Sequence, residues 1–348
     1  MITVLRQSAA VFTAAAVILA VGIAPVTAQS PAQASAAVAS FYDGKQIGVL
    51  LGGVGGEFDL NLRLMSKYFP QHMPGNPRIV PQYMTGSGGL KRASYLYTVA
   101  PKDGTMLGLI PENFPALQAI GGKGIEFDVK KFHWIGAFSP FNDAYLVWYT
   151  AGVRTFDDLK TKQVISGATG RDSMSYIYPA LINAFFGAKI KIIIGYEGGS
   201  TINAAMERGE VQARHNTWTS LQQTKGDWLA EQKVFVVAQS GPAETGPTGV
   251  PIIEKIAPTE DAREIIGLAI SGGYLGRPLA TNPNVPRERV AALRKAFIET
   301  LADPEFLVEA KKLKVNVNPI PGEKLQEMVG HVLDFPERLV PRAREILQ

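Results

Sequence analysis

Short apolar runs alternate with amphipathic stretches along most of the chain, which is typical of an α/β protein. Segment 45–51 predicts a buried strand. The stretch 57–69 predicts a helix, because Phe58, Leu62, Met65 and Phe69 recur at the spacing of one helical face. Glycines separate the two segments, so the fold begins with a strand, a glycine-rich turn and a helix.

The same criteria predict the remaining elements. Further strands are expected at 78–83, 106–110, 133–138, 144–149, 164–166, 189–194, 234–238 and, as a long strand, 264–276. A helix that ends at about residue 97 is expected after the second strand. Further helices are expected at 173–186, 200–208 and 286–301, and the last of these has a proline near its first turn. The region beyond 301 is expected to be mainly helical.

The order of these elements predicts two α/β domains. Residues 41–149 and 250–348 form domain 1, which is discontinuous, and residues 150–249 form domain 2, inserted between its two parts. The chain is expected to cross between the domains near Tyr149 and again somewhere within 240–270. These two crossings would form a hinge.

The first 28 residues have the layout of a cleaved secretory signal. Arg6 supplies a positive charge, residues 9–23 form an almost unbroken apolar run, and Val26-Thr27-Ala28 is a small-x-small cleavage site. The alternative is a membrane anchor, but the apolar run is short for crossing a bilayer. No cysteine follows the run, which excludes the usual bacterial lipid attachment. The protein is therefore expected in the periplasm, with a loose segment up to about Ser40.

Composition narrows the class of protein. The chain has no cysteine, so thiolate chemistry and disulfides are excluded, and its 46% hydrophobic residues suffice for a core. The net charge is +4, but the basic residues are scattered, which argues against nucleic acid binding. The usual motifs of hydrolases, zinc enzymes and nucleotide-binding proteins are missing, and the four histidines lie far apart. No cofactor, metal ion or catalytic residue is expected.

Four glycine-rich turns stand between a predicted strand and a predicted helix. They are 52–56, 86–89, 167–170 and 195–201. Glycine lets the backbone approach a ligand, and free N–H groups at a helix start bind anions. The alternative is that these are ordinary turns needing glycine for their geometry. Because the turns divide between both predicted domains, they indicate an anion-binding cleft walled by amides.

Several motifs resemble the periplasmic receptors of tripartite tricarboxylate transporters, the Bug or TctC family. Gly55-Gly56-Glu57-Phe58-Asp59 with Arg63 resembles the family's G-G-x-x-D-x-x-A-R signature, with Leu62 in place of alanine. Gly86-Ser87-Gly88-Gly89 is similar to its P-G-A-G-G loop, although Thr85 replaces the proline. Segments 100–105, 195–199 and 207–211 resemble three further motifs. The order and spacing match across essentially the whole chain after residue 28.

The resemblance implies a type II periplasmic binding fold with a hinge and a ligand cleft between its domains. It implies a monomeric receptor that is not an enzyme, and that delivers a small carboxylate to integral membrane permease subunits. In such receptors loop amides and ordered waters hold the ligand carboxylate. Carried over by position, the binding residues are Gly53, Val54, Gly55, Gly56, Phe58, Ser87, Gly88, Gly89, Thr169, Gly170, Arg171, Asp172, Ser173, Tyr176, Gly198, Gly199, Ser200, Asn216 and Trp218.

Some of these positions have two interpretations. Asp59 would repel a ligand carboxylate, so it is interpreted as a cap that fixes its loop. Arg171 either pairs with a second ligand carboxylate or forms a surface ion pair with Asp172. Tyr176 and Trp218, like Phe141, either cover an apolar ligand body or pack in the core.

The segment after Val211 also departs from the family. Gln212 stands where many relatives have aspartate, which lessens the case for an amino-acid ligand, and residues 215–218 are candidates to line the cleft instead. Two other functions stay open. One is an exported hydrolase or lyase that uses His215 with Ser173 or Thr217, and the other is a module that presents its ligand to a sensor.

Overall fold

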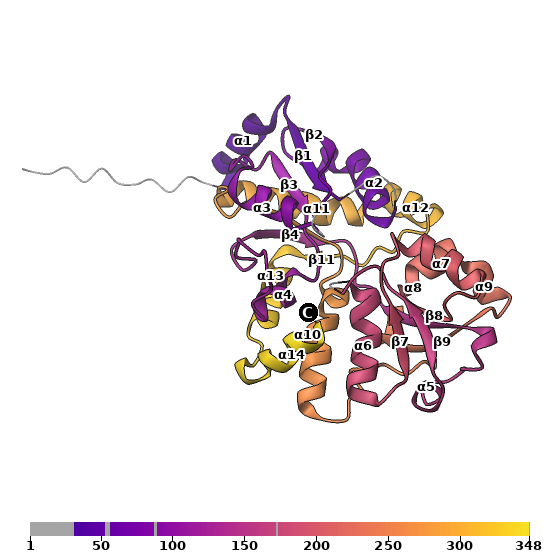
Figure 1. Ribbon diagram of the computed structural model, residues 1–348. Coiled ribbons are helices and arrows are strands. Elements are labelled where there is room, and N and C mark those ends of the chain that lie inside the picture. The colour runs from indigo at the N-terminus through magenta and orange to yellow at the C-terminus, as the bar shows by residue number, and fades with distance from the viewer. Residues whose placement is uncertain (1–30, 53–55, 87–88, 172, 348) are drawn as a thin grey trace, which may run out of the picture.

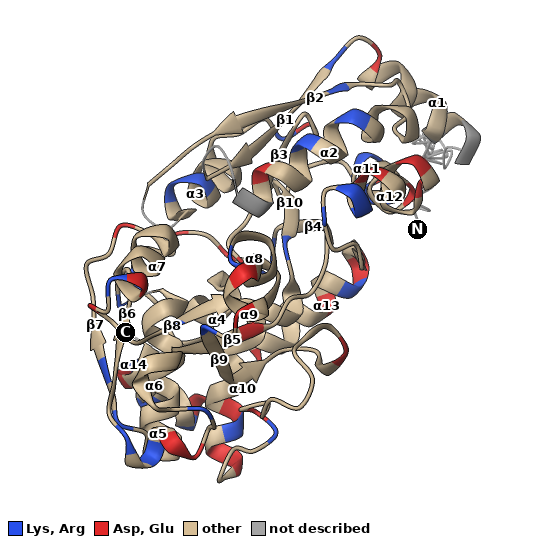
Figure 2. Cartoon of the chain, turned by 90° about the vertical axis from the view of Figure 1, so that its right-hand side faces the viewer, with Lys and Arg blue, Asp and Glu red and all other residues tan. Residues whose placement is uncertain are grey.

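The computed structural model describes residues 31–52, 56–86, 89–171 and 173–347. In these residues two separate β-sheets are each flanked by helices, as Figure 1 shows. Lys and Arg are interspersed with Asp and Glu over both halves of the molecule (Figure 2). The predicted signal segment 1–28 lies outside the described residues. Within them, no helix is both long and apolar enough to cross a membrane.

The first sheet has six strands in the order β11-β4-β10-β3-β1-β2. Its strands are β1 (Gln46–Leu51), β2 (Arg78–Tyr83), β3 (Met106–Leu109), β4 (His133–Ala137), β10 (Pro278–Thr281) and β11 (Ile320–Pro321). β1 pairs in parallel with β2 and β3, whereas β10 runs antiparallel to both β3 and β4. The C-terminal part of the chain therefore completes a sheet that the N-terminal part begins.

Apolar helix faces cover this sheet. Leu62, Met65 and Phe69 of α2 are buried together with Phe297 of α11, which is the face that the spacing predicts. The helices of this half are α1 (Pro31–Tyr42), α2 (Gly56–His72), α3 (Leu90–Thr98), α4 (Phe114–Ala119), α11 (Arg287–Ala302), α12 (Pro304–Lys312) and α13 (Gly322–Leu333).

The second sheet has five strands in the order β7-β6-β8-β5-β9. Its strands are β5 (Asp143–Trp148), β6 (Val164–Gly167), β7 (Ile190–Ile193), β8 (Ala213–Thr217) and β9 (Val234–Ser240). β5 lies between β8 and β9, is buried throughout and runs antiparallel to both. The helices between these strands are α5 (Asp158–Thr161), α6 (Met174–Phe186), α7 (Gly199–Glu207), α8 (Trp218–Thr224) and α9 (Gly226–Ala230).

Two C-terminal helices, α10 (Glu260–Leu275) and α14 (Val340–Leu347), pack against α6 of the second half. α10 and α6 stand side by side in Figure 1. Their contacts belong to one core cluster that also contains Tyr145 and Ala116, which come from opposite halves of the molecule. The two sheets are therefore joined by a continuous apolar core as well as by the chain crossings.

The structure corrects two sequence predictions. Segment 264–276 is not a strand, because it lies in helix α10, whose side chains are buried on most faces. A helix buried on several sides has the same near-continuous apolar sequence as a buried strand. Residues 31–40 are not loose, since they lie in α1, where the Val38 side chain is buried and the Tyr42 hydroxyl donates to Gly104 O over 3.1 Å.

The chain first crosses from the first sheet to the second between β4 and β5, at residues 138–142. β5 thus belongs to the second sheet, although it lies within the range 41–149 predicted for domain 1. The Phe141 N–H donates to Gly273 O of α10 over 2.9 Å, and the Phe138 N–H donates to Arg277 O over 3.3 Å. These bonds hold the crossing against the C-terminal segment that returns to the first sheet.

Candidate functional site: a cavity between the two sheets

A cavity of about 270 Å³ lies where the two sheets meet. Its walls come from four parts of the chain: residues 111–113 after β3, the crossing at Phe141 and Asp143, the start of α6, and alternate residues of β8. One side is closed by α10, through Ala269, Ile270, Gly272 and Gly273. A space bounded by two α/β halves is the usual location of a ligand site in such proteins.

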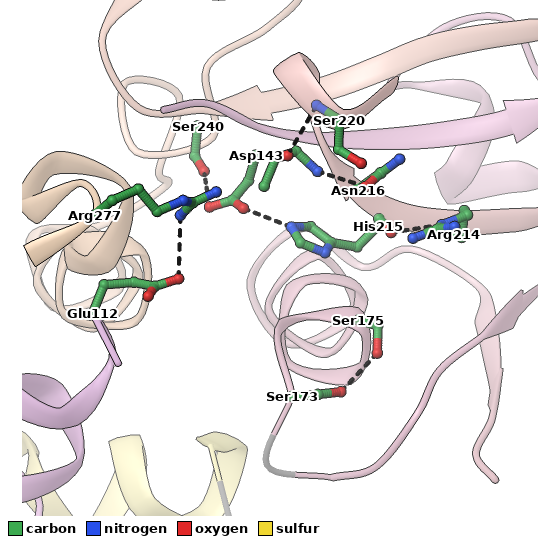
Figure 3. Close-up of polar contacts among 11 residues, drawn as sticks. Glu112, Asp143, Ser173, Ser175, Arg214, His215, Asn216, Ser220, Ser240 and Arg277 are labelled. Carbon is green, nitrogen blue, oxygen red and sulfur yellow. Dashed lines mark hydrogen bonds and ion pairs between the residues drawn. The ribbon is translucent and has the colours of Figure 1, made fainter. Parts of the chain in front are cut away.

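A buried Asp–His pair forms the wall on the second sheet. His215 Nε2 lies 2.7 Å from Asp143 Oδ1, and both side chains are less than a tenth exposed (Figure 3). The Ser240 hydroxyl lies 3.4 Å from the other oxygen of Asp143. The ring of Tyr178 packs 5.3 Å from the imidazole. These contacts fix the orientation of the imidazole at the cavity wall.

Alternation along β8 decides which residues face the cavity. His215 and Thr217 line it, and a strand turns successive side chains to opposite faces. Arg214 and Asn216 therefore point to the other face. Asn216, which was predicted to line the cleft, accepts a hydrogen bond at Oδ1 from the Thr217 N–H over 3.0 Å.

The arginine that directly precedes β10 lies beside the cavity in the first half. The Arg277 guanidinium lies 3.8 Å from the ring centroid of Phe141 and 4.9 Å from that of Phe58. Its Nη1 lies 3.4 Å from Glu112 Oε1, and its side chain is only 6% exposed. Stacking and the ion pair together hold this buried cation in place.

The first two glycine-rich turns lie largely outside the described residues. The predicted residues outside the described part are Gly53, Val54, Gly55, Ser87 and Gly88. Gly56 is the first residue of α2, and Gly89 directly precedes α3. Gly89 has φ +96°, and a Cβ there would lie 2.5 Å from Pro111 Cγ at the cavity wall. Only glycine fits this position without strain.

Arg92 lies behind both of these turns. Its Nε donates to Leu109 O over 2.8 Å, and a Cβ on Gly52 or Gly89 would come within about 3 Å of its guanidinium. Burial lowers the pKa of Arg92, with Glu112 opposing that effect. The positive charge therefore sits directly beneath two turns that were predicted to bind an anion.

Asp59 is buried at the first turn of α2 and accepts hydrogen bonds from two side chains. Arg63 Nε donates to Oδ2 over 2.9 Å, and the Tyr83 hydroxyl donates to Oδ1 over 2.7 Å. These partners tie α2 to β2. The predicted capping of loop amides stays a prediction, since much of that loop lies outside the described residues.

The third turn, after β6, is held by a group of hydroxyls. The Thr169 N–H donates to Ser175 Oγ over 3.0 Å, and the Ser173 hydroxyl donates to Gly170 O over 2.7 Å. Ser173 lines the cavity. Asp172 lies outside the described residues, and Arg171 is exposed, with its Nη1 donating to the Tyr176 hydroxyl over 3.0 Å. Arg171 and Tyr176 therefore contact each other around the start of α6.

The fourth turn precedes α7, and Arg214 lies behind it. Arg214 Nη1 donates to Gly199 O over 2.7 Å, and its Nε donates to His215 O over 2.9 Å. Burial lowers the pKa of Arg214 to about 10. Gly198 and Ser200 lie beside Gly199 at the start of the helix, where the Gly198 N–H donates to Thr201 Oγ1 over 3.1 Å.

The cavity wall includes only part of the predicted set. Ser173 lines it, as do Phe141, His215 and Thr217, but the described wall does not include the turn at 198–200. Trp218 packs against the core of the second half instead. Glu112, Asp143 and the four wall residues of α10 were not predicted from the sequence. The last group was missed because α10 was predicted to be a strand.

Within the described part of the chain, no group of three or more His, Asp or Glu side chains is placed to hold a metal ion. Ser173 and His215 share the cavity, but the hydrogen bonds of the Ser173 hydroxyl are to Gly170 O and Ser175 Oγ. Figure 3 shows the two serines apart from the imidazole. The Ser173 hydroxyl and the His215 imidazole therefore have separate hydrogen-bond partners.

Comparisons with known proteins identify the fold of the chain. No protein-family model matches the chain, and no curated protein sequence matches it either. Three solved structures are similar to 86–88% of it, at 15–16% identity.

The first of these structures is a TctC solute-binding protein from Polaromonas, with TM-score 0.63 and 99% of its own chain covered. The second is the periplasmic binding protein BugD, with TM-score 0.62 and 98% covered. The third is Rpa4515 from R. palustris with adipate, with TM-score 0.61 and 96% covered. The chain thus has the α/β fold of periplasmic solute-binding proteins, which confirms the fold class predicted from its sequence.

Proposed function

We propose that this protein is a periplasmic receptor of the Bug or TctC type, which captures a small organic carboxylate between its two sheets. The observation that carries the proposal is the cavity of about 270 Å³, whose walls come from both halves of the molecule. The fold agrees with it, and one protein of the same fold is described with adipate, a dicarboxylate.

Anion binding in this proposal comes from backbone amides supported by buried cations. Glycine-rich turns precede α2, α3, α6 and α7, where N–H groups at a helix start favour negative charge. Arg92 lies beneath the first two turns and Arg214 beneath the fourth. The predicted ligand-binding residues of these turns remain part of the proposal.

The receptor works by closure. Domain 1 (41–149 and 250–348) and domain 2 (150–249) approach each other when one ligand contacts both. The crossing at 138–142 is one of the hinge segments. Although β5 lies within the range predicted for domain 1, it moves with domain 2, because it belongs to the second sheet. The exported, monomeric receptor then delivers its ligand to the membrane subunits of a tripartite tricarboxylate-type transporter.

A thermal-shift screen of mono-, di- and tricarboxylates tests the proposal. A ligand present at 100 times its Kd adds about 2.7 kcal/mol to the free energy of unfolding and raises the melting temperature accordingly. Neutral sugars and nucleobases serve as controls of similar size. If these controls stabilise the protein and no carboxylate does, the proposal is wrong.

One observation favours a second function, hydrolysis or elimination. The buried His215–Asp143 pair shares the cavity with Ser173 and Thr217, and enzymes use such pairs to activate a hydroxyl. The Ser173 hydroxyl is hydrogen-bonded elsewhere, which disfavours this alternative. Turnover of a bound acid or ester that His215→Ala abolishes would establish catalysis in place of simple capture.

A further inference from the structure

The two places where the chain crosses between the sheets lie side by side. The first crossing is at residues 138–142, and Arg277 lies where the chain returns from α10 to the first sheet. The Phe138 N–H donates to Arg277 O over 3.3 Å. Gly276 has φ +73°, and a Cβ there would clash with Ser139 O of the first crossing. A hinge motion between the two halves therefore involves both crossings at once.

The Arg277 side chain extends from the second crossing into the first half, behind the cavity wall. Its guanidinium carbon lies 3.8 Å from the ring centroid of Phe141 and 4.9 Å from that of Phe58. Its Nη1 lies 3.4 Å from Glu112 Oε1 (Figure 3). Phe141 belongs to the first crossing, Phe58 to the first turn of α2, and Glu112 to the loop after β3. One guanidinium thus contacts three separate parts of the structure.

The chemistry of a guanidinium suits this position. Its flat faces stack on aromatic rings while N–H groups at its edge pair with a carboxylate, which a lysine ammonium cannot do at the same time. Phe141 and Glu112 line the cavity, whereas Arg277 is not among the described residues of its wall. Any effect of Arg277 on a ligand therefore acts through the residues that it holds.

We propose that Arg277 is a positioning residue that couples the hinge to the ligand cavity. The inference rests on the proposed function, in which the two halves close around a ligand. Closure displaces the first crossing at Phe141, and Arg277 carries that displacement to Glu112 in the cavity wall and to Phe58 at the start of α2. Because such coupling is reciprocal, a ligand that fixes the wall also biases the hinge toward closure.

Arg277→Lys tests this role, because it keeps a positive charge near Glu112 but removes the planar group that stacks on both rings. Arg294→Lys is the matched control. Arg294 also belongs to the first half, where it donates to Trp134 O over 2.9 Å and pairs with Glu323 at 3.0 Å. The described cavity wall does not include it. An arginine that only stabilises the fold would lower the melting temperature without changing ligand affinity.

Isothermal titration with succinate, glutarate and adipate measures that affinity at a temperature where circular dichroism shows every variant folded. Arg277→Lys is expected to weaken the tightest of the three ligands about tenfold, as expected for the loss of a buried stacking interaction. Arg294→Lys is expected to change it by less than about twofold. Unchanged affinity in Arg277→Lys overturns the inference and leaves the proposed function intact.

A double-mutant cycle with Phe141→Leu tests whether Arg277 acts through the ring that it stacks on. If it does, the double variant Phe141→Leu/Arg277→Lys binds no more weakly than the weaker of the two single variants. If the two losses of affinity multiply, the residues act independently and the inference is wrong. The cycle also separates the coupling from any direct contact between Phe141 and the ligand.

Hydrogen–deuterium exchange of the free protein tests the coupling without a ligand. Arg277→Lys is expected to speed exchange both at 138–142 and at 60–65 of α2, whereas Arg294→Lys leaves both segments unchanged. Faster exchange around Arg277 alone overturns the inference. If Arg277→Lys does not fold, Phe141→Leu is measured in the same way, with faster exchange expected at 60–65. Failure of the natural protein to bind any carboxylate rejects the proposed function, while the exchange result still decides the coupling.

Discussion

A buried arginine stands behind a glycine-rich turn in each half of the molecule. Arg92 lies within about 3 Å of where a Cβ on Gly52 or Gly89 would be, and Arg214 donates to Gly199 O. Burial costs each guanidinium its hydration, as the lowered pKa of both groups shows. Each turn therefore has a fixed positive charge behind it, which in the proposed function strengthens anion binding by the amides in front.

The sequence does not identify these two arginines. Arg92 and Arg214 are two of many scattered basic residues, and nothing near them in the chain indicates burial. Tertiary packing buries them, and it brings Leu109 O to Arg92 and Gly199 O to Arg214. The glycines could be predicted because their requirement is local, whereas a buried ion becomes visible only with its distant partners.

Glu254 provides a prediction about pH. It accepts hydrogen bonds from the Gly241 N–H over 3.0 Å and from the Tyr274 hydroxyl over 2.9 Å, and burial raises its pKa. An acid with a raised pKa in the folded state loses stability as pH rises from its ordinary pKa through the raised one. The Glu254→Gln variant has no such loss and keeps an acceptor for both donors.

The free energy of unfolding of Glu254→Gln, relative to the natural protein, is therefore expected to increase between pH 4.5 and 7. The increase amounts to about 1.4 kcal/mol for each unit by which the folded-state pKa is raised. Urea denaturation at several pH values measures it, with the exposed Glu345→Gln as the control. A difference that stays constant or shrinks with rising pH would contradict the assignment.

At the scale of elements, most predicted strands and helices exist within a few residues of their expected ends. Segment 78–83 coincides with β2, and 286–301 falls on α11 with Pro286 preceding its first residue. These elements have clear periodicity and clear stop signals. β10 was missed because it has only four residues and begins with a proline. α10 was mistaken for a strand because isoleucines buried on several faces remove its helical periodicity.

α10 also allows a matched pair of substitutions. Alanine stabilises an open helical position relative to glycine by about 1 kcal/mol. Gly267 has no atom within 4 Å of an added Cβ, so Gly267→Ala is expected to raise the melting temperature. At Gly273 the same Cβ would lie 2.9 Å from Phe141 O, which belongs to the backbone of the crossing.

Gly273→Ala is accordingly expected to lower the free energy of unfolding by about 1–3 kcal/mol, in the range of overpacked positions. Thermal denaturation of both variants under identical conditions measures the two shifts. Shifts of the same sign would mean that the crossing does not pack tightly against α10.

At the scale of the whole molecule, the sequence predicted two α/β halves and a cleft but not which residues line the cavity. Its wall combines residues 111–113, Phe141 and Asp143, residues 173–174, His215 and Thr217, and four residues of α10, which are brought together only by the folded chain. The family resemblance pointed to the glycine-rich turns, and Ser173 is the described cavity residue that it identified. Glu112 and Asp143 carry no motif, so their proximity required the tertiary structure.

The central claim is that one small carboxylate occupies the cavity and contacts both sheets. Hydrogen–deuterium exchange with and without the tightest-binding acid tests it most directly. Slower exchange is expected at residues 109–113 of the first half and, in the same experiment, at 213–217 of the second half and 269–273 of α10. Protection confined to one sheet, or located away from these segments, would contradict it.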